Sequence, residues 1–290
     1  MAIKEYTKQF TGLLPDIFAS QAYFLEAFGG TIQVRDGVSN NDTFMELKIS
    51  AETDAVLQEY KTDANTGGFG DGTGGNRFGK RTEIKSVNKQ VAYNTPLAIH
   101  EGIDAFTVND VPEQVVAERL AKHSEAWADH TSQELGKKLS TDAGKTITDK
   151  LTEEGVKKAF AEARKTLINN KVRKDAVKIA YVTSDVYDIL LESKLTTTAK
   201  GSSVNIDRAE VLMFKGFAII EVPSHLFQTG DNIYFVVANV GVVGVGIQVA
   251  RALDSEDFYG IALQGAGKDA NYIPDKNKKA IVKAQLAPVG

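Results

Sequence analysis

The sequence predicts an α+β fold, and three observations support this prediction. Apolar and polar residues alternate over residues 31–35 and 45–50, which is typical of half-buried strands. From Asp110 onward, apolar side chains recur every three or four residues, which predicts one long amphipathic helix. Apolar runs at residues 233–238 and 242–249, rich in valine, predict buried strands in the second half of the chain.

Length and composition narrow the possible classes of protein. A chain of 290 residues is near the upper limit for one hydrophobic core, so one large domain or two linked subdomains are both expected. The net charge of −4 provides no overall attraction to nucleic acid or to an anionic membrane. There is no cysteine, which excludes disulfides, thiolate metal sites and cysteine nucleophiles and fits assembly in a reducing cytoplasm. No apolar run is long enough to predict a membrane span.

Residues 1–30 predict an N-terminal arm with a short amphipathic helix. Pro15 can open this helix, Phe18 and Tyr23 are among its apolar residues, and the pair Gly29-Gly30 ends it. Two hypotheses stay open for the arm. It docks on a neighbouring chain, or it packs on its own core.

Residues 45–93 predict a long excursion, with a strand leading out, a glycine-rich tip and a strand leading back. A loop of this length is rarely idle in a compact domain. The tip contains GGFGDGTGGNRFGKRT at residues 67–82, which matches both G-x-G-x-x-G and G-x-x-x-x-G-K. A phosphate-binding loop needs a preceding strand, a following helix and Ser or Thr after the lysine. Here Arg81 follows Lys80, the preceding residues are polar, and the following ones are strand-like.

We therefore interpret the glycines as giving mobility to the tip. The alternative, a nucleotide-dependent enzyme that uses Gly74–Lys80, is kept as the rival from another class of protein. The tip also carries aromatic and basic side chains that can contact another molecule. We predict that these residues, together with Phe18 and Tyr23 of the arm, form inter-subunit contacts: Phe69, Arg77, Phe78, Lys80 and Arg81.

After the long helix, the pattern predicts a second helix over residues 153–168 and a buried strand over 177–182. Thr183 to Asp185 then cap a short helix. Residues 211–222 predict a hairpin that turns at Lys215-Gly216. In residues 242–249 valines occupy one face and glycines the other, so close approach of another backbone is expected there. Segments 259–264 and 279–286 are expected to form a last strand pair.

The polar side chains predict no catalytic residue, no metal site and no cofactor. His123 and His130 are seven residues apart on the long helix, whereas a helical metal pair prefers a spacing of four, so we expect helix-surface or interface histidines. His100 and His225 lack the context of a nucleophile–histidine site. Trp127 is expected in the core. Two charged groups are interpreted mainly as solvated turns: Asp254–Asp257, alternatively one side of an inter-subunit ion pair, and Lys276, Lys278 and Lys279, alternatively a DNA contact.

The order of these elements resembles that of a known protein family. The segment TPLAIHEGIDAFTVNDVPEQVVAERLAKHSEAWADHTSQELGKKL runs directly into the long helix, and KIAYVTSDVYDILLES forms a buried strand and a short helix. The hairpin LMFKGFAIIEVPSHL, the strand NIYFVVAN and the tail DFYGIALQGAGKDANYIPDKNKKAIVKAQL follow. Over nearly its whole length, the chain resembles the major capsid proteins of tailed bacteriophages, which have the Hong-Kong-97-like fold.

This resemblance implies an organisation into five regions. They are an N-terminal arm (1–30), an extended loop with flanking peripheral-domain strands (31–110), a spine helix of the peripheral domain (111–150), an axial domain (151–240) and a return to the peripheral domain (241–290). It also implies a structural, non-enzymatic protein located in the virion and assembled in the host cytoplasm. The implied partners are other copies of the chain in pentamers and hexamers, a separate scaffolding protein, the portal, and double-stranded DNA held without sequence preference.

Two alternatives share this architecture or this setting. An encapsulin-type nanocompartment shell has the same fold but encloses protein cargo. Another virion component, such as a tail-tube subunit, is a more distant alternative. Such a subunit would assemble into tubes rather than closed shells.

Overall fold

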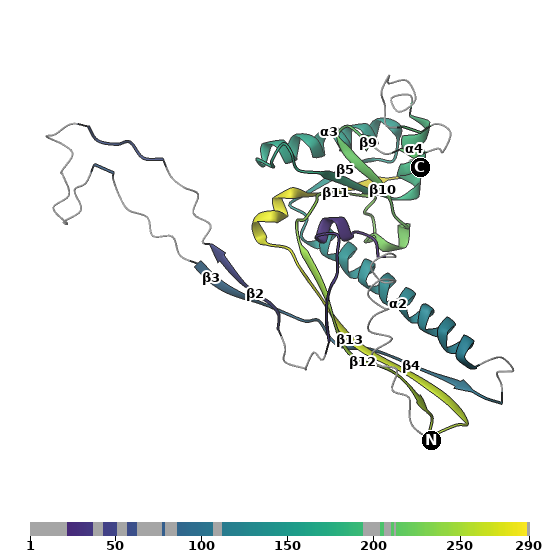
Figure 1. The fold of residues 1–290 in the computed structure, drawn as a ribbon. Coiled ribbons are helices and arrows are strands. Elements are labelled where there is room, and N and C mark those ends of the chain that lie inside the picture. Colours follow the sequence, from purple (N-terminus) through teal and green to yellow (C-terminus); the bar gives the residue numbers. More distant parts are fainter. Residues whose placement is uncertain are drawn as a thin grey trace. The chain divides into compact units, whose positions relative to one another are not determined.

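The computed structural model describes residues 22–36, 43–50, 57–62, 77–78, 86–106, 112–193, 204–205, 210–211 and 213–288. The chain divides into two compact units, residues 43–92 and the remainder. Of the predicted contact residues, Phe18, Phe69, Lys80 and Arg81 lie outside the described residues. Among its described residues, the larger unit contains three α-helices and three sheets, the smallest of which pairs β7 (Val204–Asn205) with β8 (Glu210–Val211) (Figure 1).

A six-stranded sheet forms the centre of the larger unit. Its strands, in spatial order, are β5 (Lys145–Lys150), β14 (Ile281–Ala287), β11 (Ile233–Val237), β6 (Lys178–Val182), β10 (Phe217–Glu221) and β9 (Met213–Phe214). Strand β11 runs antiparallel to both of its neighbours, β14 and β6. The predicted strands at 177–182 and 233–238 are therefore confirmed, and the second is central in the sheet.

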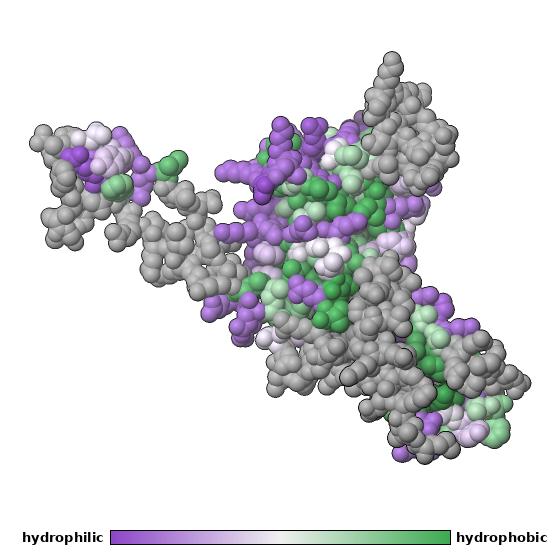
Figure 2. Space-filling view, viewed as in Figure 1, coloured by the Kyte–Doolittle hydropathy of each residue, from purple (hydrophilic) through white to green (hydrophobic). Residues whose placement is uncertain are grey.

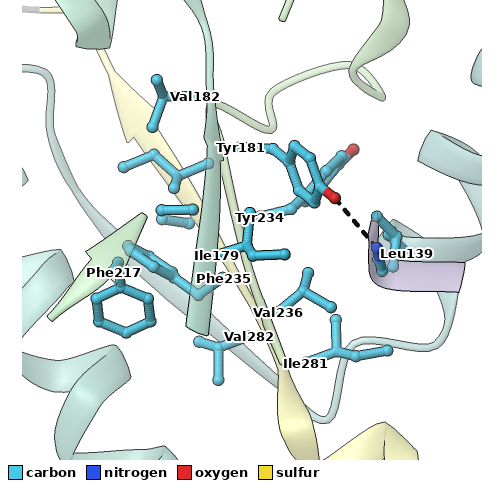
Figure 3. Close-up of a cluster of buried hydrophobic side chains, with 14 of the residues drawn as sticks. Leu139, Ile179, Tyr181, Val182, Phe217, Tyr234, Phe235, Val236, Ile281 and Val282 are labelled. Atoms are coloured by element: carbon cyan, nitrogen blue, oxygen red, sulfur yellow. Dashed lines mark hydrogen bonds between the residues drawn. The ribbon is translucent and has the colours of Figure 1, made fainter. Parts of the chain in front are cut away.

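The side chains of β11 alternate between two buried faces of this sheet. All five residues of the strand are buried, which requires protein on both sides. On one face, the ring of Phe24 contacts both Tyr181 (4.9 Å between centroids) and Tyr234 (6.0 Å). On the other, the ring of Phe235 lies 4.8 Å from that of Phe160. Figure 3 shows Tyr181 and Tyr234 on one side of the sheet and Phe217 and Phe235 on the other.

Helix α3 (Glu153–Asn169) covers the Phe235 face. The side chain of Thr152 accepts a hydrogen bond from the backbone N–H of Gly155 at 3.1 Å, which caps the start of the helix. The predicted helix is confirmed, and its buried side chains include Val156, Ala159, Phe160, Ala163 and Leu167. Helix α4 (Ser184–Glu192) follows β6 as predicted and buries Val186 and Leu190.

The opposite face is covered by an N-terminal 3₁₀ turn, η1 (Leu25–Phe28), and by the last turns of α2 (Pro112–Thr141). Phe24, Phe28, Leu135 and Leu139 all belong to the main buried cluster. Helix α2 also closely approaches the 3₁₀ turn η3 (Ser224–Leu226), because Gly136 has no side chain: a Cβ there would lie 2.4 Å from the carbonyl oxygen of Leu226. For residues 22–30, packing on the chain's own core is thus the arrangement present, and the turn ends at Gly29-Gly30 as predicted.

A four-stranded sheet runs beside α2 (Figure 1). Its strands, in spatial order, are β1 (Gln33–Asp36), β12 (Val242–Asp254), β13 (Gly260–Tyr272) and β4 (Leu97–Asp104). Val245 of β12 and Ala128 of α2 are buried against each other, and Trp127 packs beside them as expected of a core residue. Gly244 and Gly246 are buried and pair with β1 within the sheet, and the close approach of another backbone over their face stays a prediction.

Two features differ from the prediction. Residues 259–264 and 279–286 do form strands, but they do not pair: β13 belongs to the four-stranded sheet, β14 to the six-stranded one, and the 3₁₀ turn η4 (Asp275–Ala280) links them. Apolar periodicity identifies a strand but not its partner. Strand β5 was not predicted, because in KTITDK only Ile147 is a large apolar residue that becomes buried.

A buried polar network lies at the start of β11, around Asp231. The side chain of Asp231 is 1% exposed and accepts hydrogen bonds from Ser140 Oγ (2.6 Å), Gln285 Nε2 (2.9 Å) and Tyr234 Oη (3.1 Å). The ammonium of Lys283 lies 3.4 Å from the same carboxylate. Because the charges and donors are paired, this network holds α2 and β14 to β11 without leaving a buried charge uncompensated.

The fold predicts a large effect of truncating Phe160. Its ring contacts Phe214, Phe217 and Phe235 at 4.8–5.8 Å between centroids. We expect Phe160→Ala to lower the free energy of unfolding by about 3–5 kcal/mol, through lost burial and the cavity left behind. Chemical denaturation of the unassembled subunit measures this. Ile168→Ala on the same helix is the control, since Ile168 is 57% exposed and should change stability by less than about 0.5 kcal/mol. Equal losses for the two variants would contradict this account of the core.

Candidate assembly surfaces

The smaller unit, residues 43–92, is built on a two-stranded hairpin. Strands β2 (Thr43–Ser50) and β3 (Ser86–Ala92) pair antiparallel, from Thr43 opposite Ala92 to Ser50 opposite Ser86. The amide of Gln90 donates to the carboxylate of Glu46 across the strands at 2.9 Å. The predicted strand out and strand back are therefore confirmed. A two-stranded ribbon is at best marginally stable alone in water, so this unit gains by burying its surface against another body.

Within the same unit, residues 57–62 and 77–78 approach each other. The backbone N–H of Lys61 donates to the carbonyl of Arg77 at 3.0 Å. The ring of Tyr60 packs edge-on against that of Phe78, 5.1 Å away. Phe78 is nevertheless 77% exposed, and Leu57 is fully exposed. These residues, which we call the tip cluster (Leu57, Tyr60 and Phe78), present exposed apolar surface.

The segment after the glycine-rich stretch is the strand β3, and this bears on the nucleotide-binding alternative. A phosphate-binding loop opens a helix, whose N-terminus receives the phosphate. Residues 86–92 instead continue as a strand that pairs with β2. Residues 79–85, where such a helix would begin, lie outside the described residues, and the first described segment after them is a strand and not a helix.

Tyr23 of the arm lies over α2. Its backbone N–H donates to the hydroxyl of Ser132 at 3.0 Å, and its side chain is 39% exposed. Its role at an inter-subunit contact, like those of Arg77 and Phe78, stays a prediction.

A second exposed aromatic pair, which the sequence analysis missed, lies at one end of the four-stranded sheet. The rings of Phe106 and Tyr259 are 5.2 Å apart and are 81% and 70% exposed. The pair is held by backbone contacts, since Ala105 N–H donates to the carbonyl of Tyr259 at 2.8 Å. The two aromatics are 153 residues apart in the sequence, so local periodicity could not find the pair.

Helix α2 is fixed to β4 by an ionic cluster around Glu101. Arg119 Nε donates to this carboxylate at 2.8 Å, and His123 Nε2 lies 2.9 Å from it. The guanidinium of Arg119, followed by His123, lowers the pKa of Glu101 from 4.5 to about 2, against the effect of burial. His123 is 7% exposed, so it is not a helix-surface histidine but packs between α2 and β4 within the chain.

His130 lies two turns further along α2 than His123 and faces Asp269 of β13. Its Nε2 lies 3.7 Å from Asp269 Oδ1, and this carboxylate raises the pKa of His130. Asn94 holds the other oxygen of Asp269, with Nδ2 donating at 2.7 Å, and its backbone N–H donates to the carbonyl of Asp269 at 2.8 Å. Asp269 thus fixes the chain just before it enters β4.

Three more of the polar residues singled out in the sequence, His225, His100 and Lys278, have structural partners. His225 Nε2 lies 3.0 Å from Asp129, and His100 contacts Gln264. Lys278 lies 2.8 Å from Asp275 and 3.2 Å from Asp142, in keeping with a solvated turn. In the part of the chain that the structure describes, no group of three or more His, Cys, Asp or Glu side chains is arranged to hold a metal ion. No helix in this part is long and apolar enough to cross a membrane.

Comparison with solved structures identifies the fold. The chain superposes on a subunit of the capsid of the cyanophage P-SCSP1u with a TM-score of 0.65, covering 92% of this chain and 89% of that one at 12% identity. It matches the mature capsid of bacteriophage PhiM1 with a TM-score of 0.67, at 93% and 88% coverage and 10% identity. A virus-like particle from Pyrococcus furiosus matches with a TM-score of 0.51, at 97% and 99% coverage and 13% identity.

No family model and no curated protein sequence matches the chain. The likeness is thus one of structure, and it extends over nearly the whole chain. The protein has an α+β, Hong-Kong-97-like capsid fold, as the sequence predicted.

The cluster around Glu101 predicts an acid-dependent loss of stability. Because the pKa of Glu101 is lower in the folded chain, its contribution is full above about pH 4.5 and is lost as the pH falls toward 2. The wild type should therefore be more stable than Glu101→Gln at pH 7, with the difference shrinking below about pH 4.5. Urea midpoints measured across this range test it. Glu125→Gln, which removes an exposed carboxylate paired with Lys122, is the control and should show a much smaller difference at every pH. Parallel curves for the wild type and Glu101→Gln would contradict the assignment.

Proposed function

We propose that this protein is the major capsid protein of a tailed phage, and that it self-assembles into an icosahedral shell around a double-stranded DNA genome. The observation that carries the proposal is the match of nearly the whole chain to subunits of phage capsids. The proposal is that of a structural protein without catalytic activity.

The hairpin unit suggests how subunits hold one another. Residues 43–92 form a unit separate from the main core, and their ribbon has little capacity to stabilise itself. We propose that this unit lies over a neighbouring subunit and that the tip cluster is buried there. Arg77 and Phe78, with Phe69, Lys80 and Arg81 nearby in the sequence, would supply the contacts, while Phe18 and Tyr23 would supply those of the arm.

The two larger sheets suggest a division of the larger unit. We propose that the six-stranded sheet with α3 and α4 is the axial domain and that the four-stranded sheet with α2 is the peripheral domain. Sheet membership then adds residues 145–150 and 281–287 to the axial domain expected at 151–240.

The proposed partners follow from this role. They are other copies of the chain in pentamers and hexamers, a scaffolding protein and the portal during assembly, and the packaged DNA. Assembly would take place in the host cytoplasm and the mature protein would reside in the virion.

A nanocompartment shell is the second candidate. It is favoured by the match to the virus-like particle from Pyrococcus furiosus, although at a lower TM-score, 0.51, than the two phage capsids. The contents of purified particles separate the two, since a phage shell holds DNA and a nanocompartment holds an enzyme.

Electron microscopy of the expressed protein, with its scaffolding protein where one is required, tests the proposed function. Closed shells of uniform size support it. Tubes would instead indicate a tail component, and soluble subunits that never assemble, alone or with scaffold, would overturn it.

Shortening the tip predicts a specific loss of assembly. Deleting residues 66–79 should leave a soluble subunit with unchanged thermal stability, because the main core lies in the other unit. Particle formation should fall at least about tenfold, because the contacts that the tip makes on a neighbour are lost. Sedimentation and microscopy measure both quantities. Normal particles from the deletion would contradict the proposed role of the hairpin unit.

The tip cluster allows a sharper test without a deletion. The double variant Tyr60→Ser, Phe78→Ser removes apolar surface that the structure leaves exposed, and the subunit should fold normally. If these rings are buried on a neighbour, assembly yield should fall by about tenfold or more. Met213→Ser, also an exposed apolar side chain at 52%, is the control on another surface. An equal yield for the double variant and the control would exclude the cluster as an assembly contact.

A further inference from the structure

A basic groove lies between α3 and the turn that joins β9 to β10. Its volume is about 420 Å³, and it is lined by Ala161, Arg164, Lys165, Ile168, Asn169 and Lys215. These six residues include three cations and no carboxylate. Figure 2 shows hydrophilic side chains gathered over the region of α3.

The turn holds Lys215 over the helix. Phe214, the preceding residue, packs edge-on against Phe160 of α3 at 5.0 Å, which fixes the hairpin on the helix. Lys215 and Gly216 both have positive φ, 47° and 86°, as a tight two-residue turn requires. The ammonium of Lys215 donates to the carbonyl of Lys157 at 2.7 Å and lies 5.7 Å over the ring of Phe214. Lys215 is thus held in place rather than extended into solvent.

Positive charge in the groove is uncompensated within the described residues. On the first half of α3, Lys157 pairs with Glu153, and Lys158 pairs with Glu154 at 2.9 Å. Further along, no described carboxylate lies within ion-pair distance of Arg164, Lys165 or Lys215. Desolvation, together with the neighbouring charges of Lys157 and Arg164, lowers the pKa of Lys215. An anion in the groove would relieve this repulsion.

The cations are also arranged in a row. Basic residues recur at 157–158 and 164–165 of α3, a step of seven residues, or about 10 Å along the helix axis, and Lys171 follows just beyond the end of the helix. The side chains of Arg164, Lys165 and Lys171 are exposed. Several cations beside an open groove, with Arg164, Lys165 and Lys215 unpaired among the described residues, suit an extended polyanion better than a single small anion. Of the extended anions, a nucleic acid carries one phosphate charge on every nucleotide, so its backbone can meet several of these cations at once.

We propose that the groove of Arg164, Lys165 and Lys215 binds the phosphate backbone of double-stranded DNA, without reading its sequence. The identity of the polyanion rests on the proposed function, in which the shell encloses DNA. The groove supplies ammonium and guanidinium donors for phosphate oxygens, and the Asn169 amide adds a neutral donor. In this way a chain with a net charge of −4 attracts DNA at one surface without attracting it generally.

The test uses the full chain as unassembled subunits and a fluorescent duplex of about 20 base pairs of mixed sequence, with anisotropy measured over a range of salt. The triple variant Arg164→Gln, Lys165→Gln, Lys215→Gln should bind about tenfold or more weakly. It should also lower the slope of log affinity against log salt by about 2–3, since each phosphate contact contributes about 0.9.

A control with the same change in net charge separates local from general electrostatics. In the variant Lys122→Gln, Lys137→Gln, Arg251→Gln, three cations elsewhere are neutralised, and all three are exposed. Its affinity should stay within about twofold of the wild type. Equal weakening of both triple variants would overturn the proposal, because the charge of the whole chain would then explain the binding.

Two competitors distinguish the other sources of negative charge. Inorganic phosphate at the same phosphate concentration should compete poorly, because it occupies only one step of the row. A peptide of residues 252–259, which contains Asp254–Asp257, represents an acidic segment of a second copy and should also compete poorly. If either displaces the duplex as well as unlabelled DNA does, the proposal is wrong.

The failures of the two proposals can be told apart. Microscopy scores shell formation, and anisotropy scores the groove on subunits that are not assembled. If the wild type never forms shells, the proposed function fails, while the effect of the triple variant still tests the groove. If shells form and the triple variant binds DNA like the wild type, only the groove assignment fails.

Discussion

The burial of β11 on both faces is the constraint on which the larger unit depends. Its five residues, Ile233–Val237, are all buried, so a cover on each face is needed to keep them from water. Helix α3 provides one cover through Phe160, and η1 with the end of α2 provides the other. Without both covers, Tyr234 or Phe235 would expose a large apolar ring. The network around Asp231 then fixes the strand at its start, where the sheet meets α2.

Because α2 covers one face of β11, it also connects the two larger sheets. The last turns of the helix are part of the main core through Leu135 and Leu139. Earlier turns are tied to the four-stranded sheet by two ionic contacts, those of Arg119 with Glu101 and of His130 with Asp269. One helix therefore connects both sheets. Asp269 also accepts a hydrogen bond from Asn94, which follows the hairpin unit in the sequence. The chain is therefore fixed to β13 at Asn94, just before it enters β4.

Much of the fold could be predicted because it depends on local patterns. The stripes of α2 and α3, the capping at Thr152 and the turn at Lys215-Gly216 are all visible within a few residues of sequence. Strand pairing is different, because it depends on contacts between distant segments. Residues 259–264 and 279–286 were correctly recognised as strands, yet they pair with β12 and β4 in one case and with β5 and β11 in the other. β5 was missed since a strand at the edge of a sheet needs few buried side chains.

The surfaces were harder to predict than the core, for a related physical reason. Glu101 and Asp269 reach the helix histidines from strands far away in sequence, so His123 and His130 carried no local sign of their partners. Phe106 and Tyr259 meet only because β4 and β13 pair. Charge behaves in the same way. Lysines 157, 158 and 165 look alike in the sequence, but carboxylates one turn earlier neutralise the first two, while folding brings Lys215 to the second half of the helix. The net charge of the chain does not show which charges are paired and which are not. Only the folded chain shows where unpaired positive charge is concentrated.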